Sequence, residues 1–109
     1  MADLKRGQIV WCDLEEEPRA GEAGRRRPVL IVSSNRMSPA GPAVIVPLTS
    51  TPRAYPTVIE LTDCLPRTSY LQCEQVRAVS RARLGAVIAT VDPAVMRRVE
   101  AVLRRILEL

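Results

Sequence analysis

Short apolar runs, each closed by proline, glycine or charge, are the feature that most constrains how this chain folds. Six segments are rich in β-branched residues or alternate apolar with polar side chains: residues 8–14, 29–32, 44–46, 57–61, 70–79 and 84–91. Runs of this length and composition are typical of strands and are too short for core helices. Between the first two, residues 15–26 contain Pro18, Gly21 and Gly24 without apolar periodicity. They predict a loop whose length is typical of a functional segment.

The C-terminal segment has a helical pattern instead. Asp92 followed by Pro93 is a helix-start signal, because an N-cap acceptor stands before a proline at the first helical position. Apolar residues then recur at spacings of three and four: Val95, Val99, Val102, Leu103 and Ile106. One amphipathic helix after several short strands predicts a mainly β fold. We expect a small antiparallel barrel with a C-terminal α-helix, forming a single domain over residues 1–109.

The residue types that are missing exclude several classes of chemistry. Histidine is absent from the 109 residues, which excludes a Ser-His-Asp triad, a His-based acid–base pair and a His-ligated metal site. The three cysteines, Cys12, Cys64 and Cys73, lack C-x-x-C spacing, and we expect them to be reduced and mostly buried. No apolar run is long enough to span a bilayer, and the N-terminus lacks a signal-peptide core. The sequence therefore predicts a cytoplasmic protein without metal, cofactor or membrane association.

The charge balance favours a nucleic-acid partner. Sixteen basic residues stand against twelve acidic ones, for a net charge of +4, and all the basic residues except Lys5 are arginine. The planar guanidinium binds phosphate and stacks on bases, although a GC-rich coding sequence would produce the same bias toward arginine.

The strongest candidate for chemistry is the carboxylate of Glu22 with the run Arg25, Arg26 and Arg27 before Pro28. Proline forces the residue before it into an extended conformation, which fixes the direction of Arg27 beside the long loop. Such a pair can stabilise a charged phosphorus centre and accept a proton. Taken alone, a solvated charge run is the favoured interpretation.

Two further groups of polar residues interrupt apolar runs. Thr49 and Ser50 close the run that ends in P-L-T-S, where their hydroxyls can cap backbone groups or bind phosphate oxygens. Gln75 and Arg77 belong to an E-Q-V-R quartet within the 70–79 run. Turn chemistry explains the first group equally well, and a buried hydrogen-bond network explains the second.

Taken together, these motifs resemble a known family. From the N-terminus onward, the motifs are R-G-x-I-V-W-x-D-L, a loop with a glutamate, R-P-V-L-I-V-S, P-L-T-S and E-Q-V-R. The chain resembles the MazF/PemK type of bacterial toxin over residues 5–107. The resemblance implies an SH3-like barrel with a C-terminal helix, a homodimer, and metal-independent, sequence-specific cleavage of single-stranded RNA, opposed by a cognate antitoxin protein. It also implies that Arg27 and Thr49 are catalytic.

Elementary chemistry agrees with that implied activity. RNA is cut without metal or histidine when its own 2′-hydroxyl attacks the adjacent phosphorus, so the protein need only orient the attack and stabilise charge. Arg27 is expected to stabilise the phosphorane and Thr49 to bond a non-bridging oxygen. Glu22 is the candidate base. The predicted RNA contacts are Arg25, Arg26, Ser50, Gln75 and Arg77.

Differences from the family pattern lie in the loop. The family commonly reads G-x-E-Q-x-G-x-R-P, whereas residues 20–28 read A-G-E-A-G-R-R-R-P. The glutamate and the Arg-Pro pair are kept. We expect the change to affect the preferred cleavage sequence more than activity itself.

Two alternatives act by binding partners instead of cutting RNA. A related class of barrel toxin poisons DNA gyrase through an aromatic-containing C-terminal tail, but this chain ends R-I-L-E-L without an aromatic residue. A nuclease-inactive binding module on the same fold is the other alternative, and the presence of both Arg27 and Thr49 argues against it.

Overall fold

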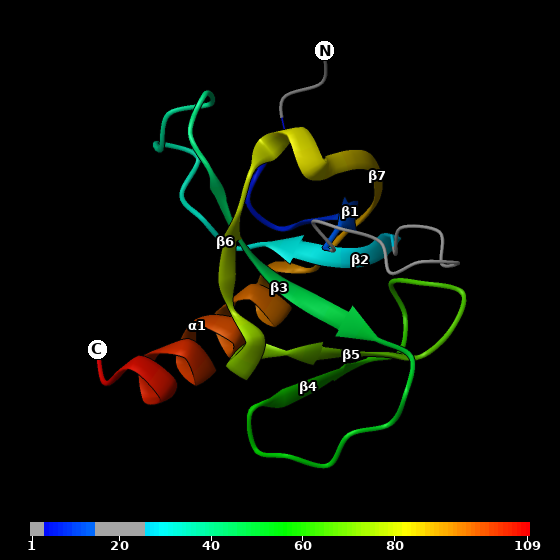
Figure 1. Cartoon of the computed structure of the whole chain (residues 1–109). Coiled ribbons are helices and arrows are strands. Elements are labelled where there is room, and N and C mark those ends of the chain that lie inside the picture. Colours follow the sequence, from blue (N-terminus) through cyan, green and yellow to red (C-terminus); the bar gives the residue numbers. More distant parts are fainter. Residues whose placement is uncertain (1–3, 15–25) are drawn as a thin grey trace, which may run out of the picture.

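The computed structural model describes residues 4–14 and 26–109, in which seven strands precede one long helix (Figure 1). The strands are β1 (Gln8–Asp13), β2 (Arg26–Ile31), β3 (Ala43–Thr49), β4 (Val58–Leu61), β5 (Ser69–Gln72), β6 (Arg77–Val79) and β7 (Leu84–Thr90). Two single turns of 3₁₀ helix, η1 (Cys73–Gln75) and η2 (Arg81–Arg83), precede β6 and β7, and the helix is α1 (Pro93–Leu107). The predicted mainly β class with a C-terminal helix is confirmed.

All strand pairs are antiparallel, and β3 is the strand on which the sheet is built. The pairing path runs β4-β5-β3-β2-β1-β7, and β6 also pairs with β3. The first half of β3 therefore pairs with β6 and its last residues with β5, while β2 lies along the opposite edge. In Figure 1, β4 and β5 lie below β3, and β2 and β1 lie above it. Within the described residues no ladder joins β4 to β7, so the strand path is open and not closed into a barrel.

The structure corrects one predicted strand. The sequence suggested an unbroken strand over residues 70–79, but η1 divides it into β5 and β6. The backbone N–H of Cys73 still donates to the carbonyl of Thr57, 3.2 Å away, in line with the β4–β5 register, but Val76 N–H then donates to the Cys73 carbonyl at 3.2 Å and closes a turn. Glu74 accepts a hydrogen bond from the Thr57 hydroxyl at 2.8 Å. The turn closed by Val76 and the Glu74–Thr57 hydrogen bond therefore interrupt the strand pattern at η1.

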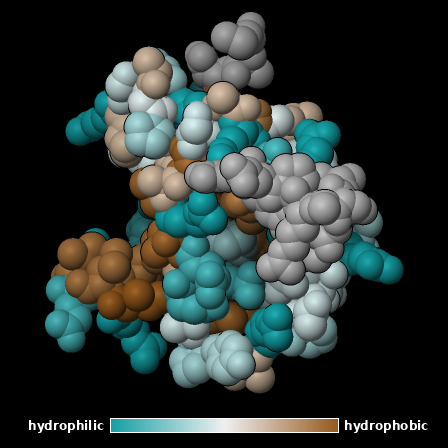
Figure 2. Space-filling view, viewed as in Figure 1, coloured by the Kyte–Doolittle hydropathy of each residue, from teal (hydrophilic) through white to brown (hydrophobic). Residues whose placement is uncertain are grey.

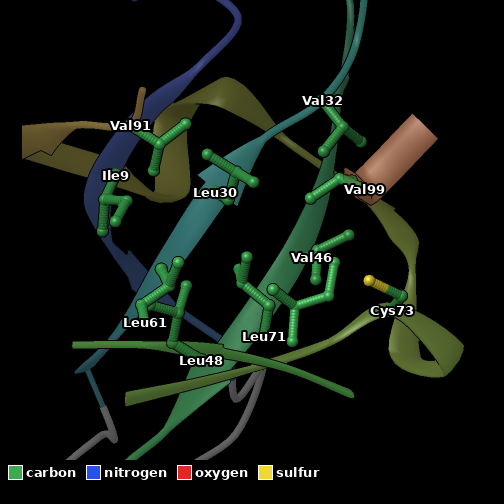
Figure 3. Close-up of a cluster of buried hydrophobic side chains, with 11 residues drawn as sticks. Ile9, Leu30, Val32, Val46, Leu48, Leu61, Leu71, Cys73, Val91 and Val99 are labelled. Atoms are coloured by element: carbon green, nitrogen blue, oxygen red, sulfur yellow. The ribbon is translucent and has the colours of Figure 1, made fainter. Parts of the chain in front are cut away.

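Apolar side chains are buried on both faces of the sheet that β1, β2 and β3 form. Ile9, Leu30 and Val46 point into one cluster, which the helix covers through Val99 (Figure 3). Their neighbours in sequence point into a second cluster on the other face: Val10, Cys12, Val29, Ile31, Ala43, Ile45 and Val79. Burial on both faces explains why these strands read as continuous apolar runs instead of alternating ones.

The helix begins as the sequence predicts and is tied to the sheet by the residues before β1. The Asp92 carboxylate accepts a hydrogen bond from the N–H of Ala94 at 2.9 Å, a typical N-cap. The guanidinium of Arg6 pairs with Glu100 of the helix at 2.7 Å and also donates to the Val32 carbonyl at the end of β2. Gly7 has φ 91°, a conformation that favours glycine. The Arg6 contacts join the end of β2 to the middle of α1.

The C-terminal end of the helix leaves apolar side chains in solvent. Leu107 and Leu109 are 53% and 85% exposed, and Figure 2 shows a hydrophobic patch at this end of α1. The helix ends at Leu107, and the next residue, Glu108, is its C-cap in αL geometry with φ 55°. No helix in the described ranges is long and apolar enough to cross a membrane.

Candidate active site

A surface groove of about 530 Å³ lies where the carboxyl end of β3 meets the beginning of β2. The residues that line it come from five strands and two connecting segments: Trp11, Arg27, Pro28, Leu48, Thr49, Ser50, Thr51, Leu65, Pro66, Arg67, Ser69 and Ile88. Three of the predicted site residues, Arg27, Thr49 and Ser50, lie in this one groove.

The pairing of β2 with β3 sets the relation between the two predicted catalytic residues. Val29 pairs with Pro47 and Leu30 with Val46. Continuing this register by two residues places Arg27 beside Thr49, although the two are far apart in the sequence. On the other side, Arg27 pairs with Cys12 of β1. The arginine is therefore held between β1 and the end of β3 by strand geometry.

Local hydrogen bonding shapes the end of β3. The Thr49 hydroxyl accepts a hydrogen bond from the N–H of Thr51 at 3.2 Å. A local bond of this kind is the turn interpretation of the P-L-T-S motif, and it fixes the rotamer of Thr49. A hydroxyl that accepts one bond still has its own proton to donate. Thr49 can thus be a turn residue and a hydrogen-bond donor into the groove at once.

Arg26 lies beside the groove without lining it. A methyl group at Gly85 would lie 2.8 Å from Nη2 of Arg26 and 3.5 Å from Cβ of Trp11. The guanidinium of Arg26 therefore reaches past β1 and lies over Gly85 of β7, next to the tryptophan. The missing side chain at Gly85 provides the space it occupies.

The structure places Gln75 and Arg77, two further predicted residues, outside the lining of the groove. Gln75 and Arg77 are exposed, in η1 and at the start of β6. Arg77 pairs with Ile45, four residues before Thr49 on β3, or roughly 13 Å along a strand. Neither lines the groove. Glu22 and Arg25 lie outside the described residues.

Among the groove residues that the sequence does not indicate, Trp11 and Arg67 carry the side chains best suited to binding RNA. The sequence around Trp11, R-G-x-I-V-W-x-D-L, indicates only a strand residue. The β1–β2 register then places the aromatic residue opposite Pro28. Arg67 lies between β4 and β5 and reaches the groove through the tertiary fold. No local pattern around Arg67 indicates this position.

The cysteines are free thiols, as predicted. Cys12 and Cys73 are buried and Cys64 is partly buried. Burial raises the pKa of all three, and for Cys73 the pKa is about 11. A thiol with a raised pKa is protonated near neutral pH and is a weak nucleophile. In the described part of the chain, no three His, Cys, Asp or Glu side chains gather in a group that could hold a metal ion.

Comparison with known proteins identifies the family. Residues 5–107 match the family model described as the PemK-like, MazF-like toxin of type II toxin–antitoxin systems. The chain belongs to this family. The match covers the same residues as the resemblance drawn from the motifs, so the predicted family is confirmed.

Relatives in the same family are named as MazF endoribonucleases. The chain is 31% identical over 99 residues to Endoribonuclease MazF4 of Mycobacterium tuberculosis, covering 90% of this chain and 87% of the relative. It is 30% identical over 116 residues to Endoribonuclease MazF9 of the same species, covering 97% and 98%. The prediction of an enzyme of the endoribonuclease class agrees with the names of both relatives.

Solved structures share the fold. A mycobacterial endoribonuclease in complex with its cognate antitoxin superposes with a TM-score of 0.78 at 31% identity, over 97% of this chain and 96% of the other. A MazE–MazF structure from Deinococcus radiodurans gives a TM-score of 0.84 at 24% identity, over 100% and 99%. The fold of this PemK/MazF-family chain is therefore shared along its whole length.

The thiol environments predict a graded reaction with a disulfide reagent such as DTNB. At pH 8 the native protein should release one equivalent of chromophore from Cys64, slowly relative to free cysteine because burial raises its pKa. Cys12 and Cys73 should react only after unfolding in guanidinium. The Cys64→Ser variant is the control and should show no native-state reaction. Rapid release of two or three equivalents from the native protein would contradict the described burial.

Proposed function

We propose that this toxin cleaves single-stranded RNA, in particular mRNA, in the groove that holds Arg27 and Thr49. The observation that carries the proposal is that the β2–β3 register places these two residues side by side, in a chain whose relatives are endoribonucleases. A guanidinium next to a hydroxyl offers a positive charge and a neutral donor to one phosphate. The substrate locates the protein in the cytoplasm.

The proposed reaction is an attack by the RNA on itself. The 2′-oxygen forms a bond to the adjacent phosphorus while its proton passes to a base, for which Glu22 is the candidate. The bond from phosphorus to the 5′-oxygen breaks, and that oxygen takes a proton from solvent. The products are a 2′,3′-cyclic phosphate and a 5′-hydroxyl. No metal or cofactor enters this sequence of steps.

The two groove residues have different tasks in that reaction. Arg27 is half-buried, so its charge is less screened than on an open surface and stabilises the phosphorane's extra negative charge. Arginine holds its proton too tightly to be a good acid, so its role is electrostatic. Thr49 donates a hydrogen bond to a non-bridging oxygen. Ser50, Arg25 and Arg26 are proposed to hold the neighbouring phosphates.

A homodimer accounts for the residues that lie away from the groove. Gln75 and Arg77 are exposed, in η1 and at the start of β6, and neither lines the Thr49 groove of its own chain. A two-fold axis can place the pair from one protomer along the groove of the other. Two protomers then form one continuous RNA path. We therefore propose that Gln75 and Arg77 bind RNA in the partner's groove.

The proposed inhibitor is a cognate antitoxin that covers the same groove. A structural neighbour at 31% identity is an endoribonuclease bound to its cognate antitoxin. The net charge of +4 and the arginines at 25–27 suit an acidic, flexible segment that folds on binding. Such a segment places carboxylates where RNA phosphates would lie. RNA and antitoxin should therefore compete.

Arg27→Ala should lower the rate of RNA cleavage about 10²–10³-fold, because it removes the main source of charge stabilisation. Thr49→Ala should cost about 10-fold or more, the loss of one hydrogen bond to a charged group. Both should keep the wild-type far-UV circular dichroism, since neither side chain is part of the core. The assay is fragment release from single-stranded RNA in EDTA.

Arg36→Ala is the matched control, because Arg36 is an exposed arginine outside the groove; it should cut at the wild-type rate. Cleavage by Arg27→Ala at a near wild-type rate would show that the groove is not the active site. No cleavage by the wild type under any condition would favour the binding-module or gyrase-poisoning alternatives.

The shared groove predicts complementation between two impaired variants. Arg77→Ala should weaken cleavage, and light scattering should show a dimer for each variant. When Arg27→Ala and Arg77→Ala are refolded together, random mixing should restore about a quarter of wild-type activity, because half of the dimers are mixed and each has one intact groove. Mixtures no more active than their parents, or a monomeric active protein, would contradict the proposed dimer.

A further inference from the structure

Trp11 lines the groove but takes no part in the proposed reaction, and its partial exposure to solvent calls for an explanation. It is the only tryptophan in the chain, and 39% of its surface is exposed in the free protein. Its neighbours Val10 and Cys12 on β1 are fully buried. A large indole left partly in water forgoes a substantial burial energy, so partial exposure of this kind often marks a binding surface.

The surroundings of Trp11 form an apolar part of the groove. Trp11 pairs with Pro28 across the β1–β2 ladder, and the same register places Leu48 next in the row on β3. Leu65, Pro66 and Ile88 line the groove as well. This apolar part adjoins the polar part that holds Arg27 and Thr49.

The indole is also held in place by its strand. β1 is paired on both sides, with β2 and β7, and its register shifts beside Trp11 on the β7 side. Gly85 of β7 leaves open the space next to the Trp11 Cβ, where the Arg26 guanidinium lies. An aromatic ring on a paired strand, with the Arg26 guanidinium near its Cβ and Arg27 in the same groove, offers a flat stacking surface beside phosphate-binding groups.

We infer that Trp11 is the stacking platform for a base next to the cleaved phosphate, an inference that rests on the proposed function. Sequence-specific binding of single-stranded RNA depends on unstacked bases that lie on aromatic or guanidinium planes. While Arg27 holds the scissile phosphate, the adjoining base packs on the indole, and Arg26 lies beside the same ring. Stacking holds the sugar so that its 2′-oxygen faces the phosphorus. Trp11 is thus a specificity-determining residue that touches the substrate.

The first test is a double-mutant cycle between protein and substrate. Trp11→Ala should reduce kcat/KM on an RNA oligonucleotide about 10–100-fold, while Trp11→Phe keeps most of the activity. Removing the base at one nucleotide beside the cut, with an abasic residue, should reduce wild-type kcat/KM by a similar factor. On that abasic substrate, Trp11→Ala and the wild type should have almost the same kcat/KM. If the losses of kcat/KM from Trp11→Ala and from the abasic residue multiply at every nucleotide beside the cut, the inference is overturned, because a purely structural tryptophan has no partner base.

The second test uses the fluorescence of the single tryptophan and does not depend on cleavage. An oligonucleotide with 2′-deoxy nucleotides at the cut site should bind without being cut and quench the emission of wild-type protein. The version with the abasic residue should quench much less. Tyr55→Ala, which removes an exposed aromatic residue outside the groove, is the control and should leave both the quench and cleavage unchanged.

The outcomes separate this inference from the proposed function. Cleavage by the wild type together with equal quenching by the intact and abasic oligonucleotides rejects the role of Trp11 and leaves the nuclease in place. Absence of cleavage rejects the proposed function by itself. Base-dependent quenching in that case still supports Trp11 as a stacking surface for single-stranded nucleic acid.

Discussion

The antiparallel register between β2 and β3 is the constraint on which the site depends. Backbone hydrogen bonds fix Val29 opposite Pro47. That pairing sets which residues of β2 and β3 lie opposite each other, and every second residue along each strand shares a face. A shift of one residue would turn each side chain to the other face of the sheet. Arg27 and Thr49 would then no longer lie side by side, and Leu30 would leave the cluster that it shares with Val46. Core packing and site geometry are therefore specified by the same pairing.

Burial on both faces keeps that register in place. The alternate residues of β1, β2 and β3 enter two different apolar clusters, so no slipped pairing satisfies both. The pair between Arg6 and Glu100 adds a tie between the helix and the sheet, although an ion pair that is partly exposed stabilises by only about 1 kcal/mol or less. A rigid scaffold allows a groove at the strand ends to hold charged and polar groups in fixed directions.

Most of the fold could be predicted because its signals are local. β-branched runs marked the strands, and Asp92 with Pro93 marked the start of the helix. The break at Cys73 could not be predicted, since the turn there includes Glu74, which is held by a side-chain hydrogen bond to Thr57 in a separate segment. The same holds for the site. Arg27 and Thr49 stand in recognisable motifs, whereas Trp11 reads as an ordinary strand residue until the groove is assembled around it.

The most direct test of the account is the chemical form of the RNA ends, measured by mass spectrometry on fragments from a digest in EDTA. Attack by the RNA's own 2′-hydroxyl in the Arg27–Thr49 groove requires a 2′,3′-cyclic phosphate on one fragment, or the monophosphate formed when it hydrolyses. The other fragment must begin with a 5′-hydroxyl. Fragments with a 5′-phosphate and a free 3′-hydroxyl would show that water attacked the phosphorus and would contradict the proposed mechanism.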